Sequence, residues 1–468
     1  MIGNLKPHAA YKDSGLDWLG SIPAHWSLLR AKRLFREVDE RSKTGKEELL
    51  SVSHLTGVTP RRLKNVTMFM AESNVGHKVC RPGDLVINTL WAWMAALGVT
   101  RHTGLVSPAY GVYRPFEGGG ILPAYADHLL RTPLYVAEYQ RRSTGVNSSR
   151  LRLYPEQFLR IPVLVPPLDE QARIVRFLDG VSGRLERAIR AKRKVIALLT
   201  EQKRAVINHA VTGSSHPDTA FKTCSIPSLE GIPARWEVWP FVRCTIERAD
   251  YRGATPEKVD SGIFLVTAKN VRKGWIDYGA SREYVRASDY SKIMRRGLPK
   301  KGDVLLTMEA PLGHVALIDR EDIALAQRII RFRLHPDRLL PQFALLCLNS
   351  TYFQDQLQMR ATGSTAQGIK ASKLPQLLVL CPSIQEQHQI INRVDLECAP
   401  LNRFISRLDR EIQLLREYRA RLVAEVVVGN LDIREAASLL PAEDGLDVAA
   451  DLTDEVDDVE LTDEEAEA

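Results

Sequence analysis

The sequence has few of the features that mark secreted, membrane or metal-binding proteins. It contains six cysteines, none of them in a CxxC pair, and this argues against both a zinc site and a disulfide framework. No run of about 18 apolar residues is present to span a membrane. The amino-terminal stretch also lacks the apolar core of a signal peptide. We therefore expect a cytoplasmic protein, and its 468 residues predict about three domains.

The sequence also lacks the motifs of the common enzyme classes. No phosphate-binding loop surrounds Gly45, and the glycines at 118–120 open no predicted helix. The Pro-Pro pair before Leu168 is not followed by the aromatic residue that amino-methyltransferases use to hold a target base. Neither GxSxG nor HExxH occurs, and the eleven histidines form no pair at metal-ligand spacing. We predict no catalytic residue and no metal site, so the chain is not expected to be an enzyme by itself.

The net charge of +7 combines two unlike parts of the chain. Residues 442–468 hold 13 Asp and Glu and no Lys or Arg, so the other 441 residues carry a charge of +20. A body this basic indicates a polyanionic partner. The acidic tail has no aromatic residue and is predicted to be disordered.

An internal repeat organises the sequence. Residues 166–213 align without a gap on residues 382–429, at a constant offset of 216. Weaker similarities occur in the same order in both halves. They pair residues 22–26 with 232–236, Gly83-Asp84 with Gly302-Asp303, and Thr144-Gly145 with Thr362-Gly363. The chain therefore resembles a tandem duplication in which two equivalent frameworks carry dissimilar segments.

Both repeated blocks have the pattern of long helices. Apolar residues at heptad spacing predict a coiled-coil seam, with Lys192 and Glu411 as its charged members. If the helices are antiparallel, their seams bury each other. A short helix followed by a long one is expected, with the break at Gly183–Arg184 and at Ala399–Pro400. The predicted seams are Leu185, Ala188, Lys192, Val195, Leu199, Gln202 and Val206, and Leu401, Phe404, Leu408, Glu411, Leu415, Tyr418 and Leu422.

The stretches 20–165 and 230–381 show short apolar runs separated by Gly, Pro, Asn and Asp, which is typical of strands and turns with one or two helices. The fold class is therefore α+β, with two modules that alternate with two long-helix regions in a pseudo-twofold repeat. The expected boundaries are 1–165 for the first module, 166–215 for the first helical region, 216–381 for the second module, 382–440 for the second helical region and 441–468 for the tail.

Basic residues mixed with Asn, Gln and Ser on predicted loops suit contact with nucleic acid. Cations and hydroxyls position phosphates, and Arg, Asn and Gln can read base edges. Trp91 and Trp93 could stack on a base or pack in the core. The candidate DNA-binding residues are Arg61, Arg62, Lys64, Arg141, Arg142, Asn147, Ser148 and Arg150 in the first module, and Lys269, Asn270, Arg272, Lys273, Arg295, Arg296, Gln367, Lys370 and Lys373 in the second.

The motif YKDSGLDWLGSIPAHW at residues 11–26, the block that begins PPLDEQ and ends EQKRAVINHAVTG, and the second copy of that block resemble the specificity subunit of type I restriction–modification systems. The resemblance covers the chain except its acidic tail. It implies two target-recognition domains that each read one half of a split target in double-stranded DNA, and two conserved helical regions that form an antiparallel coiled coil.

The resemblance further implies partners that perform the chemistry. Two methyltransferase subunits would use S-adenosylmethionine, and restriction/translocase subunits would use ATP and Mg, while this chain would hold no cofactor. Two alternatives remain open at this stage. One is a coiled-coil interaction scaffold that does not read nucleic acid, and the other is a fused restriction–methylation enzyme, which the missing motifs disfavour.

Overall fold

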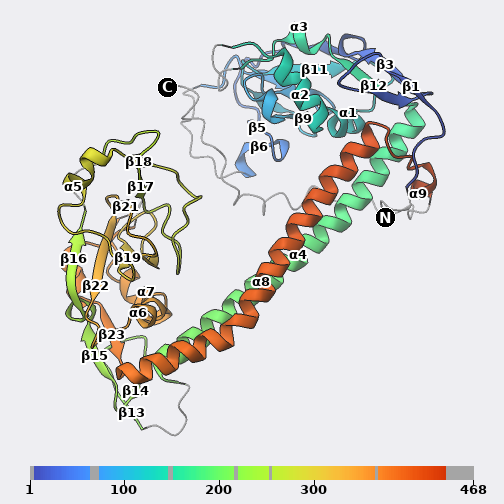
Figure 1. Ribbon diagram of the computed structural model, residues 1–468. Helices are drawn as coiled ribbons and strands as arrows, with labels where there is room; N and C mark the ends of the chain where they lie inside the picture. Colours follow the sequence, from blue (N-terminus) through green and yellow to red (C-terminus); the bar gives the residue numbers. More distant parts are fainter. Residues whose placement is uncertain are drawn as a thin grey trace. The chain divides into compact units, whose positions relative to one another are not determined.

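The computed structural model describes residues 5–63, 73–145, 151–214, 220–251, 256–363 and 367–438. The acidic tail predicted at 441–468 lies outside these residues. The chain divides into two compact units, Met1–Lys192 with Arg410–Ala468 and Arg193–Asp409. Two long helices, α4 (Leu168–Thr212) and α8 (Ile384–Val427), each contribute one half to each unit (Figure 1). Among the described residues, no helix has the length and apolar character needed to cross a membrane.

The first unit is built on a four-stranded antiparallel sheet. Its strands follow the order β4 (Phe35–Glu37), β11 (Gly111–Pro115), β8 (Leu85–Ile87), β9 (Leu97–Val99). Because successive side chains of a strand point to opposite faces, Leu85 and Ile87 pack in one core and Val86 in another. The first core also holds residues of the helices α1 (Pro123–Leu130) and α2 (Pro133–Arg142).

The second core of this unit lies against two small antiparallel strand pairs, which are inserted between the framework strands. These are β5 (Leu50–Ser53) with β6 (Gly57–Pro60), and β7 (Lys78–Cys80) with β10 (Gly104–Val106). The remaining elements of the unit are the pairs β1 (Tyr11–Asp13) with β2 (Ser21–Pro23) and β3 (Ser27–Arg30) with β12 (Pro162–Val165), the helices α3 (Pro155–Phe158) and α9 (Arg434–Ser438), and the 3-10 turns η2 (Ala31–Arg33), η3 (Arg61–Leu63) and η4 (Ala92–Met94).

The second unit repeats this framework. Its sheet has the order β16 (Thr245–Asp250), β22 (Ile329–Leu334), β19 (Val304–Thr307), β20 (Val315–Leu317), which matches the first sheet strand for strand. The helices α6 (Pro341–Leu348) and α7 (Thr351–Gln358) correspond to α1 and α2. The pairs β13 (Phe221–Lys222) with β14 (Ile232–Pro233) and β15 (Glu237–Pro240) with β23 (Leu378–Cys381) correspond to β1–β2 and β3–β12.

The two units differ in what they add to the framework. In place of the small strand pairs, the second unit has a three-stranded sheet of β18 (Tyr284–Val285), β17 (Ile263–Val266) and β21 (Ile323–Leu325), in which β17 and β21 are parallel. It also contains α5 (Tyr290–Ile293), η6 (Phe241–Cys244), η7 (Ala287–Asp289) and η8 (Ala371–Gln376). The expected α+β fold, with an internal repeat and two long helices, is confirmed.

The repeated Glu-Gln pair attaches each long helix to a module. The carboxylate of Glu170 accepts a hydrogen bond from the Trp26 indole at 3.1 Å, and Glu386 accepts the equivalent bond from Trp236 at 2.9 Å. The amide of Gln171 accepts from Leu122 N at 2.8 Å, just before α1, and donates to the carbonyl of Pro166 at 2.8 Å. Because both residues are buried in their own unit, the pair is an anchor rather than a surface motif.

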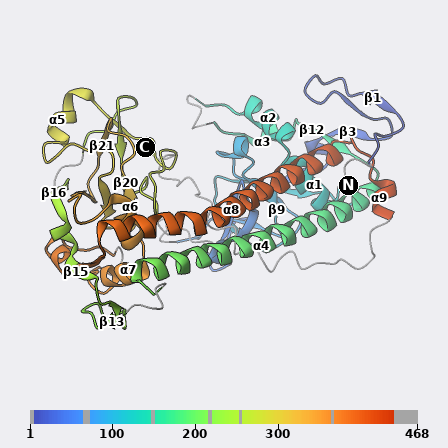
Figure 2. The same cartoon turned by 60° about the horizontal axis from the view of Figure 1, so that its bottom comes forward.

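The long helices are antiparallel, as the paired seams predict. In the first unit Lys192 Nζ lies 2.6 Å from Glu411 Oε2, so the two charged seam residues meet, and Arg419 pairs with Glu186. In the second unit Lys203 Nζ donates to Asn402 Oδ1 at 2.8 Å. In these three pairs, the residue number on α4 increases while that of its partner on α8 decreases, as antiparallel helices require. Figure 2 shows α4 and α8 side by side.

Two expectations about these helices are wrong in detail. Neither helix breaks at Gly183–Arg184 or Ala399–Pro400, since α4 and α8 run continuously through both positions. Pro400 removes one backbone hydrogen bond of α8, and its exposed position leaves the carbonyl that loses this bond open to water. The predicted seam is confirmed in part, since Leu408 and Leu422 are buried, but it is displaced at Val195, Gln202 and Phe404, which are exposed. Ile189 and Ile412 are buried instead. A straight helix of 3.6 residues per turn drifts from a seven-residue repeat, which accounts for the displacement.

The glycine that ends each long helix touches a repeated Ile-Pro strand. Gly429 has φ +84°, and a Cβ there would lie 2.6 Å from Pro23 Cδ. Gly429→Ala is expected to lower the free energy of unfolding by about 1–3 kcal/mol, because the residue needs both positive φ and the missing side chain. Urea unfolding of the full chain measures this loss. The control is Gly15→Ala, which has φ +72° but nothing within 4 Å of the added Cβ. Equal losses in the two variants would contradict the role of the contact.

Candidate nucleic-acid interface

Each module brings two loops together at the end of its central strand. In the first unit, Thr144 bridges to Arg152, and Leu153 N donates to the carbonyl of Thr89, two residues after β8, at 2.9 Å. In the second unit, Thr362 bridges to Gly368, and Ile369 N donates to the carbonyl of Met308, directly after β19, at 3.0 Å. The Thr-Gly similarity in the sequence therefore marks an equivalent loop junction in both modules.

A third loop joins this junction in the second unit. His314 Nδ1 lies 2.8 Å from the carbonyl of Val271, and Gly274 N donates to the carbonyl of Val315 at 2.8 Å. Glu309 also bridges to Gly368. We define the loop face of the second unit as residues 269–276, 308–314, 362–363 and 367–370. Its exposed basic, amide and aromatic side chains are Lys269, Arg272, Lys273, Trp275, Gln367 and Lys370.

The tip of the 269–276 loop combines positive charge with an aromatic ring. Arg272 N donates to the carbonyl of Trp275 at 2.9 Å, which closes a tight turn, and Gly274 supplies the positive φ of +113°. Trp275 is 57 % exposed, an unusual position for so large an apolar side chain. Cations beside an exposed ring can contact phosphates while the ring stacks on a base or packs on a sugar.

Two residues of this surface escaped the sequence prediction. Trp275 directly follows the predicted basic cluster, and the alternation of aromatic and basic residues was the available signal. Arg328 is half exposed and pairs with Glu309 at 3.0 Å, which places it next to the loop face. It has φ +75°, a conformation that favours glycine and that concentrates at functional sites. No pattern in the sequence indicates that conformation.

One predicted contact residue has a structural role instead. Asn270 is fully buried, with its Oδ1 accepting from Thr267 N at 2.9 Å and from Thr267 Oγ1 at 2.8 Å. Its Nδ2 donates to the carbonyls of Asp277 at 2.8 Å and Ser281 at 2.9 Å. Both polar atoms of the Asn270 side chain thus hydrogen-bond within the protein and hold the 269–276 loop in place, so the side chain is not available to a base.

The other candidates of the second unit lie on separate segments. Arg295 and Arg296 follow α5, where Arg295 is exposed and Arg296 donates to the carbonyl of Asp250 on β16. Lys373 is exposed in η8, and its backbone N donates to the carbonyl of Lys370 at 2.9 Å. Lys373 therefore continues the loop face.

In the first unit, two predicted arginines bind a buried carboxylate. Glu138 is 2 % exposed and accepts from Arg141 Nε at 2.7 Å and Arg142 Nε at 2.5 Å. Burial raises the pKa of Glu138, but hydrogen bonds from the two guanidinium groups outweigh it and hold that pKa below the ordinary value. Arg142 is mostly covered by protein, whereas Arg141 remains exposed at its outer edge. The pair thus fixes the end of α2 and leaves one cation facing solvent.

The remaining candidates of the first unit are partly described. Arg61 and Arg62 form η3 after the β5–β6 hairpin, with Arg62 exposed and paired to Glu48 at 2.6 Å. Trp91 and Trp93 are half-buried after β8, and Trp93 Nε1 donates to the carbonyl of Leu90 at 2.9 Å. Lys64, Asn147, Ser148 and Arg150 lie outside the described residues.

Comparisons with known proteins agree on one class. A family model described as the type I restriction modification DNA specificity domain matches residues 286–399. The type I restriction enzyme EcoBI specificity subunit of Escherichia coli is 24 % identical over 331 residues, which is 66 % of this chain and 69 % of that protein. The EcoKI specificity subunit of Escherichia coli strain K12 is 23 % identical over 385 residues, which is 77 % of this chain and 80 % of that protein.

A solved structure shares the fold. A chain from work on the complex assembly and conformational transition of the type I R-M system superposes with a TM-score of 0.54 at 16 % identity, covering 88 % of this chain and 99 % of that one. The shared fold therefore extends over nearly all of the similar chain.

Proposed function

Because the chain is a type I restriction–modification DNA-specificity subunit, we propose that each of its modules reads one half of a split target in double-stranded DNA. The helices α4 and α8 set the distance between the two halves. In this proposal, the target-recognition domains are residues 1–165 and 216–381. The conserved spacer regions are residues 166–215 and 382–440.

One observation carries the proposal. The two units share the order of their main sheets, the Glu-Gln anchors and the loop junction, and they differ in the elements added to that framework. A common framework with different loops is what two readers of unlike sequences require, since base edges are read by side chains on the loops and not by the frame.

The remaining parts of the assembly belong to the same proposal. Two methyltransferase subunits bind the chain and use S-adenosylmethionine, and restriction/translocase subunits use ATP and Mg. The names of the relatives and the matching domain support a non-catalytic role for this chain, which chooses the site while its partners act on it. The six free cysteines are consistent with a cytoplasmic location, where DNA and these partners would meet it.

Methylome sequencing with and without this gene tests the proposal. Loss of adenine methylation at one split motif in the knockout is expected, and an unchanged methylome would contradict it. The alternative of a scaffold that does not read DNA predicts affinity with a flat salt dependence. Phosphate contacts instead give a steep decrease of affinity with salt.

The loop face of the second unit yields a residue-level prediction. Lys273→Ala is expected to weaken the assembled complex on all DNA sequences to a similar extent and to reduce its salt slope by about 1. Trp275→Ala is expected to weaken binding to the specific target, because an exposed ring loses its apolar contact with the edge of a groove. Fluorescence anisotropy over a salt series measures both effects.

The matched control for these variants is Lys222→Ala. Lys222 is exposed on β13, which pairs with β14 beside the end of α4 rather than with the loop face. An equal loss for Lys222→Ala and Lys273→Ala would remove the loop face from the interface.

A further inference from the structure

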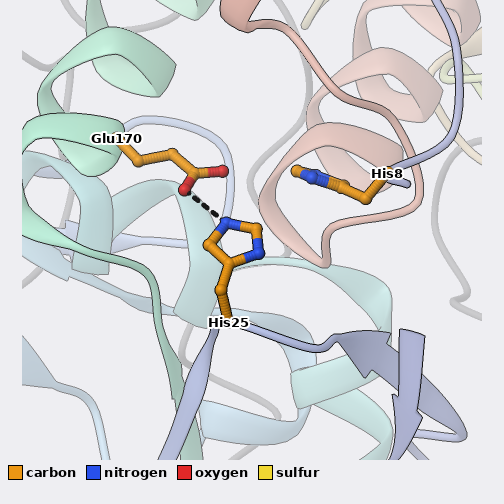
Figure 3. A group of neighbouring side chains, drawn as sticks. All are labelled: His8, His25 and Glu170. Atoms are coloured by element: carbon orange, nitrogen blue, oxygen red, sulfur yellow. Dashed lines mark hydrogen bonds and ion pairs between the residues drawn. The ribbon is translucent and has the colours of Figure 1, made fainter. Parts of the chain in front are cut away.

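Folding assembles a cluster of two imidazoles and a carboxylate that no sequence motif indicates. His8 precedes β1, His25 lies between β2 and β3, and Glu170 lies in the first turn of α4. One ligand atom from each of the three side chains lies within 4.8 Å of the others, and the side chains converge on one point (Figure 3). His25 Nε2 is 2.8 Å from Glu170 Oε2.

The second unit shows what occupies the equivalent position there. Glu386, which corresponds to Glu170, is bound by the Arg235 guanidinium at 2.6 Å and by the Trp236 indole at 2.9 Å. Arg235 aligns with His25, so the second copy neutralises its carboxylate with a permanent cation. The Glu170 side chain is only 6 % exposed and has the same requirement for a positive charge, because a buried carboxylate without a cation is costly.

His8 supplies the third group of the cluster. Its side chain is 3 % exposed, and its Nδ1 is a buried atom without a hydrogen-bond partner. The next charged group is Asp432, whose Oδ2 lies 3.9 Å from that nitrogen, beyond hydrogen-bonding distance. Asp432 itself is held by Arg434 at 2.6 Å. An unpaired buried nitrogen costs stability, so the protein groups around the His8 imidazole do not satisfy it fully.

We propose that His8, His25 and Glu170 bind a divalent transition-metal ion of the zinc class, which replaces the guanidinium of the second copy as the counter-charge of the anchor glutamate. Two imidazoles with one carboxylate form a common ligand set for Zn²⁺, and water can complete a tetrahedron. The ligand atoms of a tetrahedral zinc site lie about 3.3 Å from one another. The ligand atoms here lie within 4.8 Å of one another, so the widest pair would have to approach by about 1.5 Å when the ion binds. Glu170 Oε1 keeps its bond to Trp26, which orients the carboxylate.

The bound ion would join three separate segments of the first unit. The segment that carries His8 also contacts the end of α8, since Lys6 bridges to Asp432 and Tyr11 Oη donates to the carbonyl of Gly429 at 3.1 Å. A metal at this point therefore ties the amino-terminal segment to the start of α4 and to the residues after α8. Its role is structural, and it does not depend on the proposed reading of DNA.

Metal titration of the full-length, tag-free chain tests the site. Co²⁺ is the probe, since a tetrahedral cobalt site absorbs visible light, and Zn²⁺ competition gives the affinity. One equivalent is expected to bind to the wild-type chain. His25→Arg rebuilds the arrangement of the second copy, so this variant is expected to fold normally. Its affinity for Co²⁺ is expected to fall by more than about 100-fold, because losing a direct ligand costs more than losing a residue that only hydrogen-bonds to a ligand, which costs up to about 100-fold. His8→Ala is expected to have the same effect on binding.

His128→Ala is the matched control. His128 also faces a carboxylate on α4, with Nε2 3.4 Å from Asp179 Oδ1, but it lies outside the three-ligand cluster. Its removal should leave cobalt absorption unchanged. Absence of the cobalt spectrum in the wild-type chain, or full binding by His25→Arg, would overturn the proposal. Circular dichroism of each variant separates a lost ligand from a lost fold.

Discussion

Replacing residues 20–165 with the first module of another specificity subunit is expected to change one half of the methylated target and to leave the other half unchanged. The second module keeps all of its own core, since the second unit consists of Arg193–Asp409. Sites of the original sequence lose methylation completely, because one mismatched base pair already costs about 1–3 kcal/mol and a whole half-site contains several. Methylome sequencing of cells that carry the exchanged gene measures both halves at once.

The donor module must retain the residues that join the framework to the helices. Trp26 binds Glu170, and Tyr125 Oη donates to the carbonyl of Val427 at 3.1 Å, so both positions stay as they are here. The reciprocal exchange of residues 230–381 is the control, and it should alter only the other half-site. Changes in both halves after a single exchange would show that the modules do not read independently.

Adding seven residues to both long helices is expected to lengthen the unspecified spacer between the half-sites while the half-sites stay the same. A heptad adds about 10.5 Å to a helix and nearly preserves the direction of its faces. Since a base pair rises about 3.4 Å, the spacer should grow by about three base pairs. Suitable points are after Lys192 in α4 and before Glu411 in α8, where the two helices are paired at 2.6 Å.

The insertion has to be made in both helices because they are antiparallel partners. A heptad after Lys192 in α4 alone would leave Lys192 opposite Glu411 but displace Lys203 from Asn402, and we expect it to destabilise the chain rather than to change the spacer. This variant is the control. Methylome sequencing gives the spacer length directly, and an unchanged spacer in a stable double insertion would refute the spacer role of the helices.

The helical part of the fold was largely predictable because its signal is periodic and local. The repeat of Glu170 and Gln171 at Glu386 and Gln387 located both helices, and their charged seam residues meet as expected. The purpose of the Glu-Gln pair was not predictable. Its partners Trp26 and Leu122 lie far from it in the sequence, and only the fold brings them together.

The interface was less predictable because exposure decides which polar residues are available. Asn270 and Lys269 are neighbours in one basic cluster, yet the first is buried as a loop brace and the second is exposed. Glu138 is one turn away from Arg141 and Arg142, but only its burial shows that it binds both. The cluster of His8 with His25 was likewise invisible, since the two residues have no ligand spacing in the sequence.

The division of the long helices has a consequence for the origin of the chain. Each unit is completed by the far end of a helix that starts in the other unit, as when Gly429 packs on Pro23 and Gly213 on Pro233. A half-length ancestor with one module and one helix could not have covered its own core alone. Two identical copies could have exchanged helix ends and closed a symmetric homodimer. Such a dimer would read a palindrome, and gene fusion would then have freed the two halves to diverge toward different half-sites.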